Sequence, residues 1–365
     1  MRVAWLSLVD FRSYPTLEWN PDPEVNVLVG DNGSGKTNLL EAIAFLGSLK
    51  SFRGARDAEM ITDGEESAVL RSGVHRGEGE RLIEVEVRRS GGRRAQLDKS
   101  PLRRSGQLLG VLRSVWFLPD DLDLVKRGPA YRRDFLDDLA VQLWPGAHSD
   151  QAELARALRQ RNAFLRQGQR DDPTLDVWDA RLAQAGGRVL ARRGRVLQLL
   201  GPEIDQAYEE IAEDDERVAL NYLPSWSEGP LGVESAASLT KILVEALEVA
   251  RPTDYERRVT TLGPHRDEPS FLLDGHDARH HASQGEQRSI ALAARLAWHR
   301  LVRDATGESP LLLLDDVFSE LDERRAAALS RALPGDTQTL VTSARVEDLP
   351  VRGKLWRVGG GKVVE

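Results

Sequence analysis

The segment GDNGSGKT, residues 30–37, brings together glycines, a lysine and a threonine at a spacing suited to binding phosphate groups. It fits the pattern G-x-x-x-x-G-K-[ST], whose curled backbone points successive N–H groups at phosphate oxygens. Lys36 is expected to reach the outer phosphates of a nucleotide, and the Thr37 hydroxyl to ligate Mg²⁺. The other expected nucleotide contacts are Gly30, Asp31, Asn32, Gly33, Ser34 and Gly35. The loop predicts nucleotide binding but not the class of protein, because pumps, kinases, GTPases and DNA machines all use it.

Two carboxylates follow an apolar run at residues 311–316, which read LLLLDD. This is the form of a Walker B strand, which would bring Asp315 to the Mg²⁺ shell, directly or through water, and place Asp316 to orient the attacking water. We therefore predict that Lys36, Asp315 and Asp316 are catalytic, and that Thr37 and Asp315 bind the metal. Acidic residues often follow strands, so the pattern is weak alone; the turn SELD at 319–322 strengthens it.

A polar turn, SQGEQ at residues 283–287, opens a helix that ends shortly before LLLLDD. Ser283 with Glu286 forms a capping box, which is a sufficient structural reason for the turn. Its order and spacing also resemble the signature motif of ATP-binding-cassette ATPases, which binds the γ-phosphate of ATP held by a partner subunit. A serine hydroxyl at a helix N-terminus is an anion site that needs an anion from outside. We therefore predict that Ser283, Gln284 and Gly285 contact ATP across an ATP-dependent homodimer.

The elements that must position these residues change character along the chain. Short apolar strands alternate with turns over the first 120 residues, helical periodicity dominates from about 121 to 250, and strands return after 251. We expect an α/β fold, an ABC-type P-loop ATPase head with β-rich and α/β subdomains and an inserted helical second domain. The expected boundaries are residues 1–120 and 251–365 for the head and 121–250 for the insertion. Arg258–Leu262 is among the strands expected after 251.

The helical middle contains two expected helices, Gln151–Gln167 and Thr174–Leu200, separated by the break GQRDDP at 168–173. The second carries a seven-residue repeat, Leu175, Leu182, Val189 and Val196. This pattern fits a short antiparallel hairpin arm of roughly 40 Å, at 1.5 Å per residue. It fits an ordinary helical subdomain with a buried stripe equally well, and the sequence leaves both open.

Composition excludes several classes of protein. The chain has 365 residues and no cysteine, which rules out disulfides, thiolate metal sites and cysteine catalysis. No apolar run approaches the roughly 18 residues of a membrane span, and the N-terminus lacks a signal-peptide profile, so we expect a cytoplasmic protein without membrane contact. A net charge of −8 argues against indiscriminate binding of polyanions, although a basic patch could still bind nucleic acid.

Spacing separates the candidate cassette ATPases. Residues 38–282 lie between the phosphate loop and the signature, a longer gap than is usual in a transporter subunit. The segment TLVTSA at 339–344 has no histidine where a transporter would carry its switch, and PDD at 119–121 stands where a glutamine-bearing loop would be. Structural-maintenance-of-chromosomes proteins share the opening NGSGKTNLLEAI but carry hundreds of coiled-coil residues in the gap. Here no long coiled coil is present in the sequence.

A head without the coiled coil resembles the RecF family nearly end to end. The resemblance rests on FRSY at 11–14, the phosphate loop, SFRGARDAEMI at 51–61, FLPDDLDLVKRGPAYRRDFLD at 117–137, TLGPHRDE at 261–268, SQGEQRS at 283–289 and LLLLDDVFSELDERR at 311–325. The segment at 117–137 is the most family-specific, because no generic ATPase needs it. Arg127, where a glycine is expected, and Glu268, where an aspartate is usual, depart from the pattern without touching the nucleotide chemistry.

The resemblance implies an ATP-dependent clamp in recombinational DNA repair and replication restart. An ATP-induced dimer would bind duplex DNA near junctions with single-stranded gaps. With partners of the RecO and RecR types it would help to load RecA, and it would support the SOS response. Hydrolysis of ATP with Mg²⁺ would be weak, DNA-stimulated and used as a switch. The alternatives are another cassette ATPase head, anti-phage or transporter-associated, and a non-enzymatic nucleotide-binding scaffold, against which the intact Asp315 and Asp316 argue.

DNA contacts are harder to predict, because most arginine pairs on a surface are solvated or salt-bridged. By resemblance to related repair ATPases, Arg12 is expected to approach the adenine or ribose. His265 and Arg266 are interpreted as structural rather than nucleotide-sensing. The candidate phosphate contacts are Arg53, Arg56, Arg103, Arg104, Arg132 and Arg133.

Overall fold

The computed structural model describes residues 1–77, 79–168, 173–212, 215–347 and 349–365. The chain forms two compact units, the first comprising Met1–Asp121, Ala207–Asp214 and Ala291–Glu365, and the second Leu122–Gln206 and Asp215–Ile290. Residues 251–290, which we expected in the ATPase head, therefore cluster with the second unit. The reason is strand pairing, since Val218–Leu223 pairs antiparallel with Glu268–Leu273 and draws the later segment into the insertion.

The first sheet of unit 1 is antiparallel, in the order β2-β1-β4-β5-β6-β7. Its alternating pattern buries one residue in two along β5, as the period of a half-covered strand requires. The first two strands bring FRSY beside the phosphate loop. The strands are β1 (Arg2–Phe11), β2 (Tyr14–Trp19), β4 (Ser67–Arg76), β5 (Gly79–Arg88), β6 (Arg93–Leu97) and β7 (Ser100–Pro101).

The second sheet of unit 1 carries both predicted motifs, in the order β15-β14-β3-β13-β12-β8. All neighbours are parallel except the edge strand β15, so the carboxyl ends of β3 and β12 meet at one edge. The four leucines of β12 are all buried, as expected for a strand covered on both faces. The strands are β3 (Val25–Val29), β8 (Ser114–Phe117), β12 (Leu311–Leu314), β13 (Thr339–Ser343), β14 (Lys354–Gly359) and β15 (Lys362–Val364).

Besides the end of α5, the described residues of unit 1 include the α-helices α1 (Lys36–Ser48), α9 (Glu323–Ala332) and the later part of α8 (Gln284–Thr306). Nine of the 13 residues of α1 are buried, including Glu41, so this helix packs closely inside the unit. The part of α8 beyond Ala291 is likewise buried over most of its length, with Trp298 and His299 at most 1 % exposed.

His299 predicts a loss of stability in acid. Its Nε2 lies 3.1 Å from the Pro310 carbonyl oxygen, and burial lowers the pKa of its imidazole from 6.5 to about 4. At a pH between these two pKa values, the imidazole is protonated in the unfolded chain and neutral in the folded chain. Acidification therefore favours unfolding. From pH 7 to pH 5 the free energy of unfolding should fall by about 2 kcal/mol on account of this histidine.

The measurement is urea unfolding at both pH values for the wild type, His299→Gln and the exposed-site control His280→Gln. The His299 variant should lose less stability on acidification than the wild type, whereas the control should lose the same. An equal loss in all three proteins would contradict the buried neutral imidazole. His265, whose pKa burial also lowers to about 4, is left intact in each of them.

Unit 2 combines helices with a three-stranded sheet in the order β11-β10-β9. Strand β10 covers Ser270–Leu273, which is one of the strands expected after 251, whereas β9 and β11 were not predicted. The strand expected at Arg258–Leu262 is wrong, because α6 continues to Arg257 and ends at Arg258 in a left-handed conformation, φ 56°. The elements are α2 (Asp123–Lys126), α3 (Pro129–Leu143), α4 (Ala147–Gln167), α5 (Thr174–Ala212, which ends in unit 1), β9 (Val218–Leu223), α6 (Ala236–Arg257), β10 (Glu268–Leu273), β11 (His276–Asp277) and α7 (Ala278–His281).

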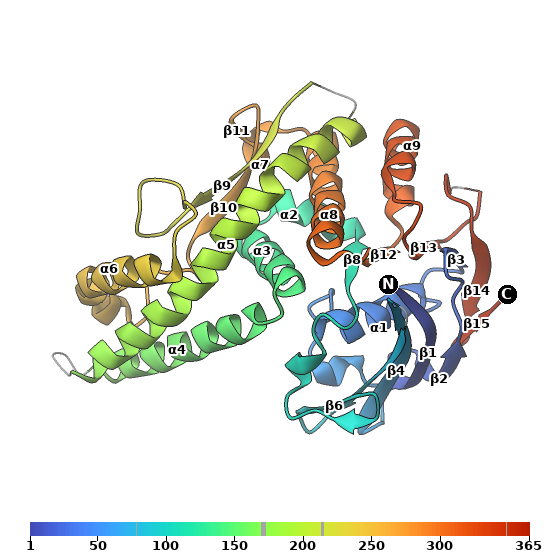
Figure 1. The fold of residues 1–365 in the computed structure, drawn as a ribbon, viewed down its shortest axis with the longest axis horizontal. Coiled ribbons are helices and arrows are strands. Elements are labelled where there is room, and N and C mark those ends of the chain that lie inside the picture. The colour runs from blue at the N-terminus through green and yellow to red at the C-terminus, as the bar shows by residue number, and fades with distance from the viewer. Residues whose placement is uncertain (78, 169–172, 213–214, 348) are drawn as a thin grey trace. The chain divides into compact units, whose positions relative to one another are not determined.

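Helices α4 and α5 form the antiparallel pair that one reading of the sequence predicted, and they lie side by side in Figure 1. Arg161 near the end of α4 meets Asp179 near the start of α5, and Arg188 farther along α5 meets Asp150 near the start of α4. The predicted stripe of Leu175, Leu182, Val189 and Val196 is buried. Of the break expected at 168–173, residues 169–172 lie outside the described residues.

The helical pair is also part of a packed subdomain, because α6 contributes buried charges to it. Arg161 Nη1 donates to Asp254 Oδ2 at 2.6 Å and to Thr260 Oγ1 at 2.9 Å, while Nε donates to Asp179 Oδ1 at 2.5 Å. Arg161, Asp254 and Thr260 are fully buried and Asp179 is nearly so. Both interpretations of the helical middle therefore describe part of the observed structure.

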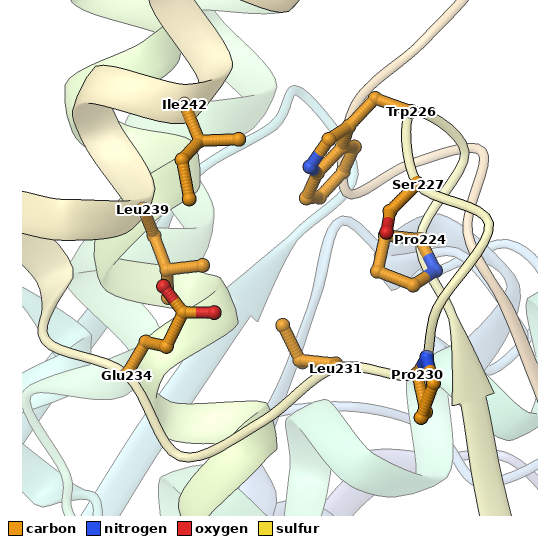
Figure 2. A pocket seen from close by; sticks show the side chains of 8 residues that line it. All are labelled: Pro224, Trp226, Ser227, Pro230, Leu231, Glu234, Leu239 and Ile242. Atoms are coloured by element: carbon orange, nitrogen blue, oxygen red, sulfur yellow. The ribbon is translucent and has the colours of Figure 1, made fainter.

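A half-open hollow of about 190 Å³ lies between α6 and the loop that precedes it. Figure 2 shows Trp226 of the loop on one side and Leu239 and Ile242 of α6 on the other. Among the described helices, none combines the length and apolar character needed to cross a membrane.

Candidate nucleotide-binding site

The phosphate loop joins β3 to α1 as predicted, and its glycines are required by its geometry. Gly35 has φ 111°, and a Cβ there would lie 2.9 Å from the Tyr14 hydroxyl. Gly30 sits against the Val358 carbonyl, which a Cβ would approach to 2.3 Å. At Gly35 the positive φ would strain any residue that has a Cβ, and at Gly30 a Cβ would clash with the neighbouring backbone. Both positions therefore require glycine.

Lys36 spans the loop that it follows. Its Nζ donates to the Gly30 carbonyl at 2.7 Å and to the Asp31 carbonyl at 3.1 Å, and the side chain is only 4 % exposed. An ammonium has three donors, so it can bind both carbonyls and still offer a proton to an anion. Asp31, Asn32 and Gly33 are exposed at the tip, where they can approach a ligand.

Tyr14 contacts the end of the phosphate loop at Gly35, a role that was not predicted from the sequence. Its hydroxyl donates to the Gly35 carbonyl at 3.0 Å, and burial raises the pKa of the phenol above its usual value, so the hydroxyl stays protonated as a donor. The only sequence signal was its place in FRSY, the segment quoted for the family resemblance. The contact joins the antiparallel sheet to the phosphate loop.

The two motifs meet where the sequence predicted. The Thr37 hydroxyl donates to Asp315 Oδ1 at 3.0 Å, and Asp315 is 5 % exposed at the carboxyl end of β12. Burial raises the pKa of the Asp315 carboxyl, while hydroxyl donors from Thr342 and Thr37 oppose that rise. A hydroxyl and a carboxylate are the hard oxygen ligands that Mg²⁺ prefers, so this pair fits the predicted metal.

Two polar atoms near this pair are buried and lack a hydrogen-bond partner within the described part of the chain: Ser34 Oγ and Asp316 Oδ1. Asp316 directly follows Asp315 and adopts a left-handed backbone, φ 46°. Native proteins rarely bury polar atoms without partners, and those that do occur cluster at functional sites. Both atoms fit a site that receives a polar ligand.

Asp121, in the PDD segment that stands where a glutamine-bearing loop was sought, is held by packing and charge. Arg295 Nη2 donates to Asp121 Oδ1 at 2.6 Å, and its guanidinium lies over the rings of Trp116 and Trp298, at 5.7 and 5.3 Å. Burial raises the pKa of the Asp121 carboxyl. This residue therefore fixes α8 to the end of β8, and its neighbour Asp120 is exposed.

Arg12 is committed to protein contacts. Nε and Nη2 donate to the two carboxylate oxygens of Glu41, both at 2.8 Å, and Nη1 donates to the Glu59 carbonyl at 2.7 Å. Glu41 is fully buried on α1, so this bidentate pair links the turn between β1 and β2 to the helix after the phosphate loop. These contacts explain the position of the Arg12 guanidinium without a bound nucleotide. The expected approach of Arg12 to the adenine or ribose stays a prediction.

The signature segment lies in unit 2 and forms the predicted capping box. The Ser283 N–H donates to Glu286 Oε2 at 2.7 Å, and Ser283 Oγ accepts from the Glu286 N–H at 3.3 Å. Below it, Gln287 Nε2 donates to the carbonyls of Ala278, Arg279 and Ala282. Ser283 and Gln284 are exposed and Gly285 is half-buried, so a buried anchor supports an accessible helix N-terminus.

The candidate DNA-binding arginines divide into two groups. Arg132 is buried and donates to the carbonyls of Pro269, Leu124, Val125 and Arg127, and Arg133 donates to the Asp267 carbonyl. Those two are structural. His265, half-buried with Nε2 3.3 Å from the Thr260 carbonyl, fits the structural interpretation made for it. The exposed group comprises Arg53, Arg56, Arg103 and Arg104.

Comparison with known proteins gives the class first. Residues 2–359 match the family model described as RecF/RecN/SMC N terminal domain. The crystal structure of the SmcHead bound to the C-winged helix domain of ScpA superimposes with a TM-score of 0.58, covering 100% of this chain and 97% of that chain, at 17% identity. At that identity the likeness concerns the fold alone. Together with the family model, it gives the fold class as an ABC-type ATPase head of the SMC-like kind.

The particular family follows from nearer relatives. The chain is 41% identical to the DNA replication and repair protein RecF of Streptomyces avermitilis, covering 100% of this chain and 99% of that protein, and 42% identical to its namesake in Kineococcus radiotolerans, covering 96% and 94%. The solved structure of the recombination mediator protein RecF-ATPrS in RecFOR pathway superimposes with a TM-score of 0.91 at 29% identity, covering 99% and 97%. This chain belongs to the RecF family.

Proposed function

We propose that this protein is an ATP-dependent DNA-binding clamp in recombinational repair and replication restart. The observation that carries the proposal is the junction of Thr37 with Asp315, which joins a phosphate loop to a Walker B carboxylate in one unit. The names of the relatives, DNA replication and repair protein RecF, supply the biological setting. A relative solved with ATP in the RecFOR pathway supports ATP as the nucleotide.

The site residues divide the chemistry among themselves. The loop Gly30–Gly35 and Lys36 bind the phosphates of ATP, and Thr37 and Asp315 hold Mg²⁺, which would neutralise developing negative charge when bound. Asp316 orients the attacking water, and its unpartnered Oδ1 is the atom available for that contact. Hydrolysis is slow and DNA-stimulated, and serves as a switch.

The signature residues act on a second copy of the chain. Ser283, Gln284 and Gly285 present a hydroxyl and a helix N-terminus that bind the γ-phosphate of ATP held by the partner, so that ATP closes a homodimer. Residues of the first unit form the ATPase head, and the second unit is the inserted domain. In this proposal the boundary between the insertion and the second part of the head lies at 290 rather than at 251, because residues 251–290 group with the second unit.

The closed dimer binds duplex DNA near junctions with single-stranded gaps and acts in the cytoplasm. Together with partners of the RecR and RecO types, it helps to load RecA, and it supports the SOS response. The exposed group Arg53, Arg56, Arg103 and Arg104 supplies phosphate contacts, since arginine forks match phosphate oxygens and these four side chains are accessible.

The test is molar mass by light scattering with Mg²⁺, with and without ATP, combined with duplex DNA binding on the same samples. Wild type should double in mass and bind DNA only with ATP, because closure supplies the signature to the partner's nucleotide. Ser283→Arg should bind ATP but stay monomeric, with DNA affinity at least about tenfold lower, since each 1.4 kcal/mol lost at an interface costs a factor of ten. The matched control Ser238→Arg, at an exposed serine near the start of α6, should behave as wild type.

Each outcome bears on the proposal. A wild type that binds ATP and remains monomeric would contradict the clamp and leave SQGEQ as a helix cap. ATP-dependent dimers that never bind duplex DNA would favour another cassette ATPase head, anti-phage or transporter-associated.

A further inference from the structure

Thr342, near the end of β13, touches both carboxylate residues of the Walker B segment. Its side chain is 1 % exposed. Thr342 Oγ1 lies 2.8 Å from Asp315 Oδ1 and 2.8 Å from the backbone nitrogen of Asp316. It belongs to TLVTSA, the segment in which no histidine was found, and β13 lies between β3 and β12 in the sheet.

The direction of these two hydrogen bonds is fixed by chemistry. A backbone N–H can only donate, so the Thr342 oxygen accepts from Asp316. The single proton of the Thr342 hydroxyl is then free for Asp315, whose carboxylate accepts it. Asp315 Oδ1 thus receives two hydroxyl donors, one from Thr37 on the phosphate loop and one from Thr342 on the neighbouring strand.

These contacts fix both the orientation of the Asp315 carboxylate and the backbone conformation of Asp316. Hydrogen bonds to a charged acceptor are stronger than neutral ones, so the Thr342 donor holds the Asp315 carboxylate in one orientation. The acceptor side of the same oxygen satisfies the N–H of Asp316, which adopts a left-handed backbone that a side chain seldom favours. One hydroxyl therefore couples the orientation of the predicted metal ligand to that of the residue predicted to orient water.

We propose that Thr342 is a positioning residue that holds Asp315 and Asp316 in the geometry needed to bind the metal–nucleotide complex. The proposal rests on the proposed function, because it assigns Thr342 a role in that same site. Thr342 acts through the two aspartates rather than by touching the nucleotide.

The experiment measures binding of a fluorescent ATP analogue as Mg²⁺ is titrated, for Thr342→Val, Thr342→Ser and the wild type. Valine keeps the shape of threonine but removes the hydroxyl, so the Mg²⁺ concentration for half-maximal effect should rise about tenfold, while binding without Mg²⁺ stays unchanged. Serine retains the hydroxyl and should restore the wild-type value. Thr339→Val is the matched control, because Thr339 is buried in the same strand and bonds the Thr337 carbonyl instead.

The outcomes separate this inference from the proposed function. If Thr37→Ala and Asp315→Asn weaken the Mg²⁺ effect but Thr342→Val does not, the positioning role is overturned and the site stands. If neither Thr37→Ala nor Asp315→Asn changes it, the proposed site itself fails. Should Thr342→Val not fold, Thr342→Ala against Thr342→Ser gives the same decision: alanine must raise the Mg²⁺ requirement and serine must not, or the inference is wrong.

Discussion

Lys36→Met should lower ATP turnover at least about a hundredfold, or about 2.7 kcal/mol of transition-state stabilisation. The substitution removes a buried ammonium that bonds the Gly30 and Asp31 carbonyls and, in the proposed function, the phosphates. Methionine has a similar length and no charge, so the loss reports on charge rather than on packing. Single-turnover hydrolysis of labelled ATP is the measurement, because slow turnover hides in a steady-state assay.

Lys241→Met is the matched control, since Lys241 is an exposed lysine on α6. It should hydrolyse ATP at the wild-type rate. A Lys36→Met protein that kept more than about a third of the wild-type rate would remove the phosphate loop from the reaction, since an electrostatic contact of this kind is worth far more.

Arg161→Met should lower the free energy of unfolding by about 3–5 kcal/mol. It leaves Asp179 and Asp254, both buried, without the guanidinium that links them. Asp179 keeps Arg251 at 2.7 Å, and Asp254 keeps the hydroxyl and N–H of Thr261, so the loss should fall short of two isolated buried charges. Urea unfolding followed by circular dichroism measures it.

The matched control is Arg159→Met, on the exposed side of the same helix, which should change stability by less than about 0.5 kcal/mol. Adding Asp254→Asn to Arg161→Met should recover part of the loss, because it removes one of the charges left unpaired. If Arg161→Met were no more costly than Arg159→Met, the buried network would not hold α4, α5 and α6 together.

Those features of the site that are formed by residues close together in the chain could be predicted from the sequence. The strand, loop and helix around Gly30–Thr37 follow from local apolar periodicity and glycine spacing, and the capping box at Ser283 follows from residues three apart. The meeting of Thr37 with Asp315 was predictable from motif chemistry, although 278 residues separate them. In each case a known role, which is phosphate binding, helix capping or metal binding, requires the residues to lie near each other.

The roles of Tyr14 and Thr342 could not be predicted, because they depend on how the strands are arranged in the sheets. A tyrosine ending FRSY and a threonine inside TLVTSA look like ordinary strand residues in the sequence, but the sheets bring Tyr14 to the phosphate loop and Thr342 to Asp315. The grouping of residues 251–290 with the second unit was not predicted for the same reason, since β9 and β10 pair across 44 intervening residues and no local signal marks the pairing. Arg12 is paired with Glu41, a buried carboxylate flanked on α1 by the apolar residues Leu40 and Ala42.

The order of strands around β3 has a consequence for synthesis on the ribosome. Both neighbours of β3 in the sheet, β13 and β14, come from residues 339–359, whereas β3 itself is complete at Val29. At about 5–20 residues per second, a ribosome needs roughly 15–60 s to make the 310 residues from Gly30 through Thr339. Throughout that time Val25–Val29 has neither partner strand. The nascent chain therefore carries an unpaired apolar strand, and its phosphate loop gains its final support only when the strands from 339–359 have emerged.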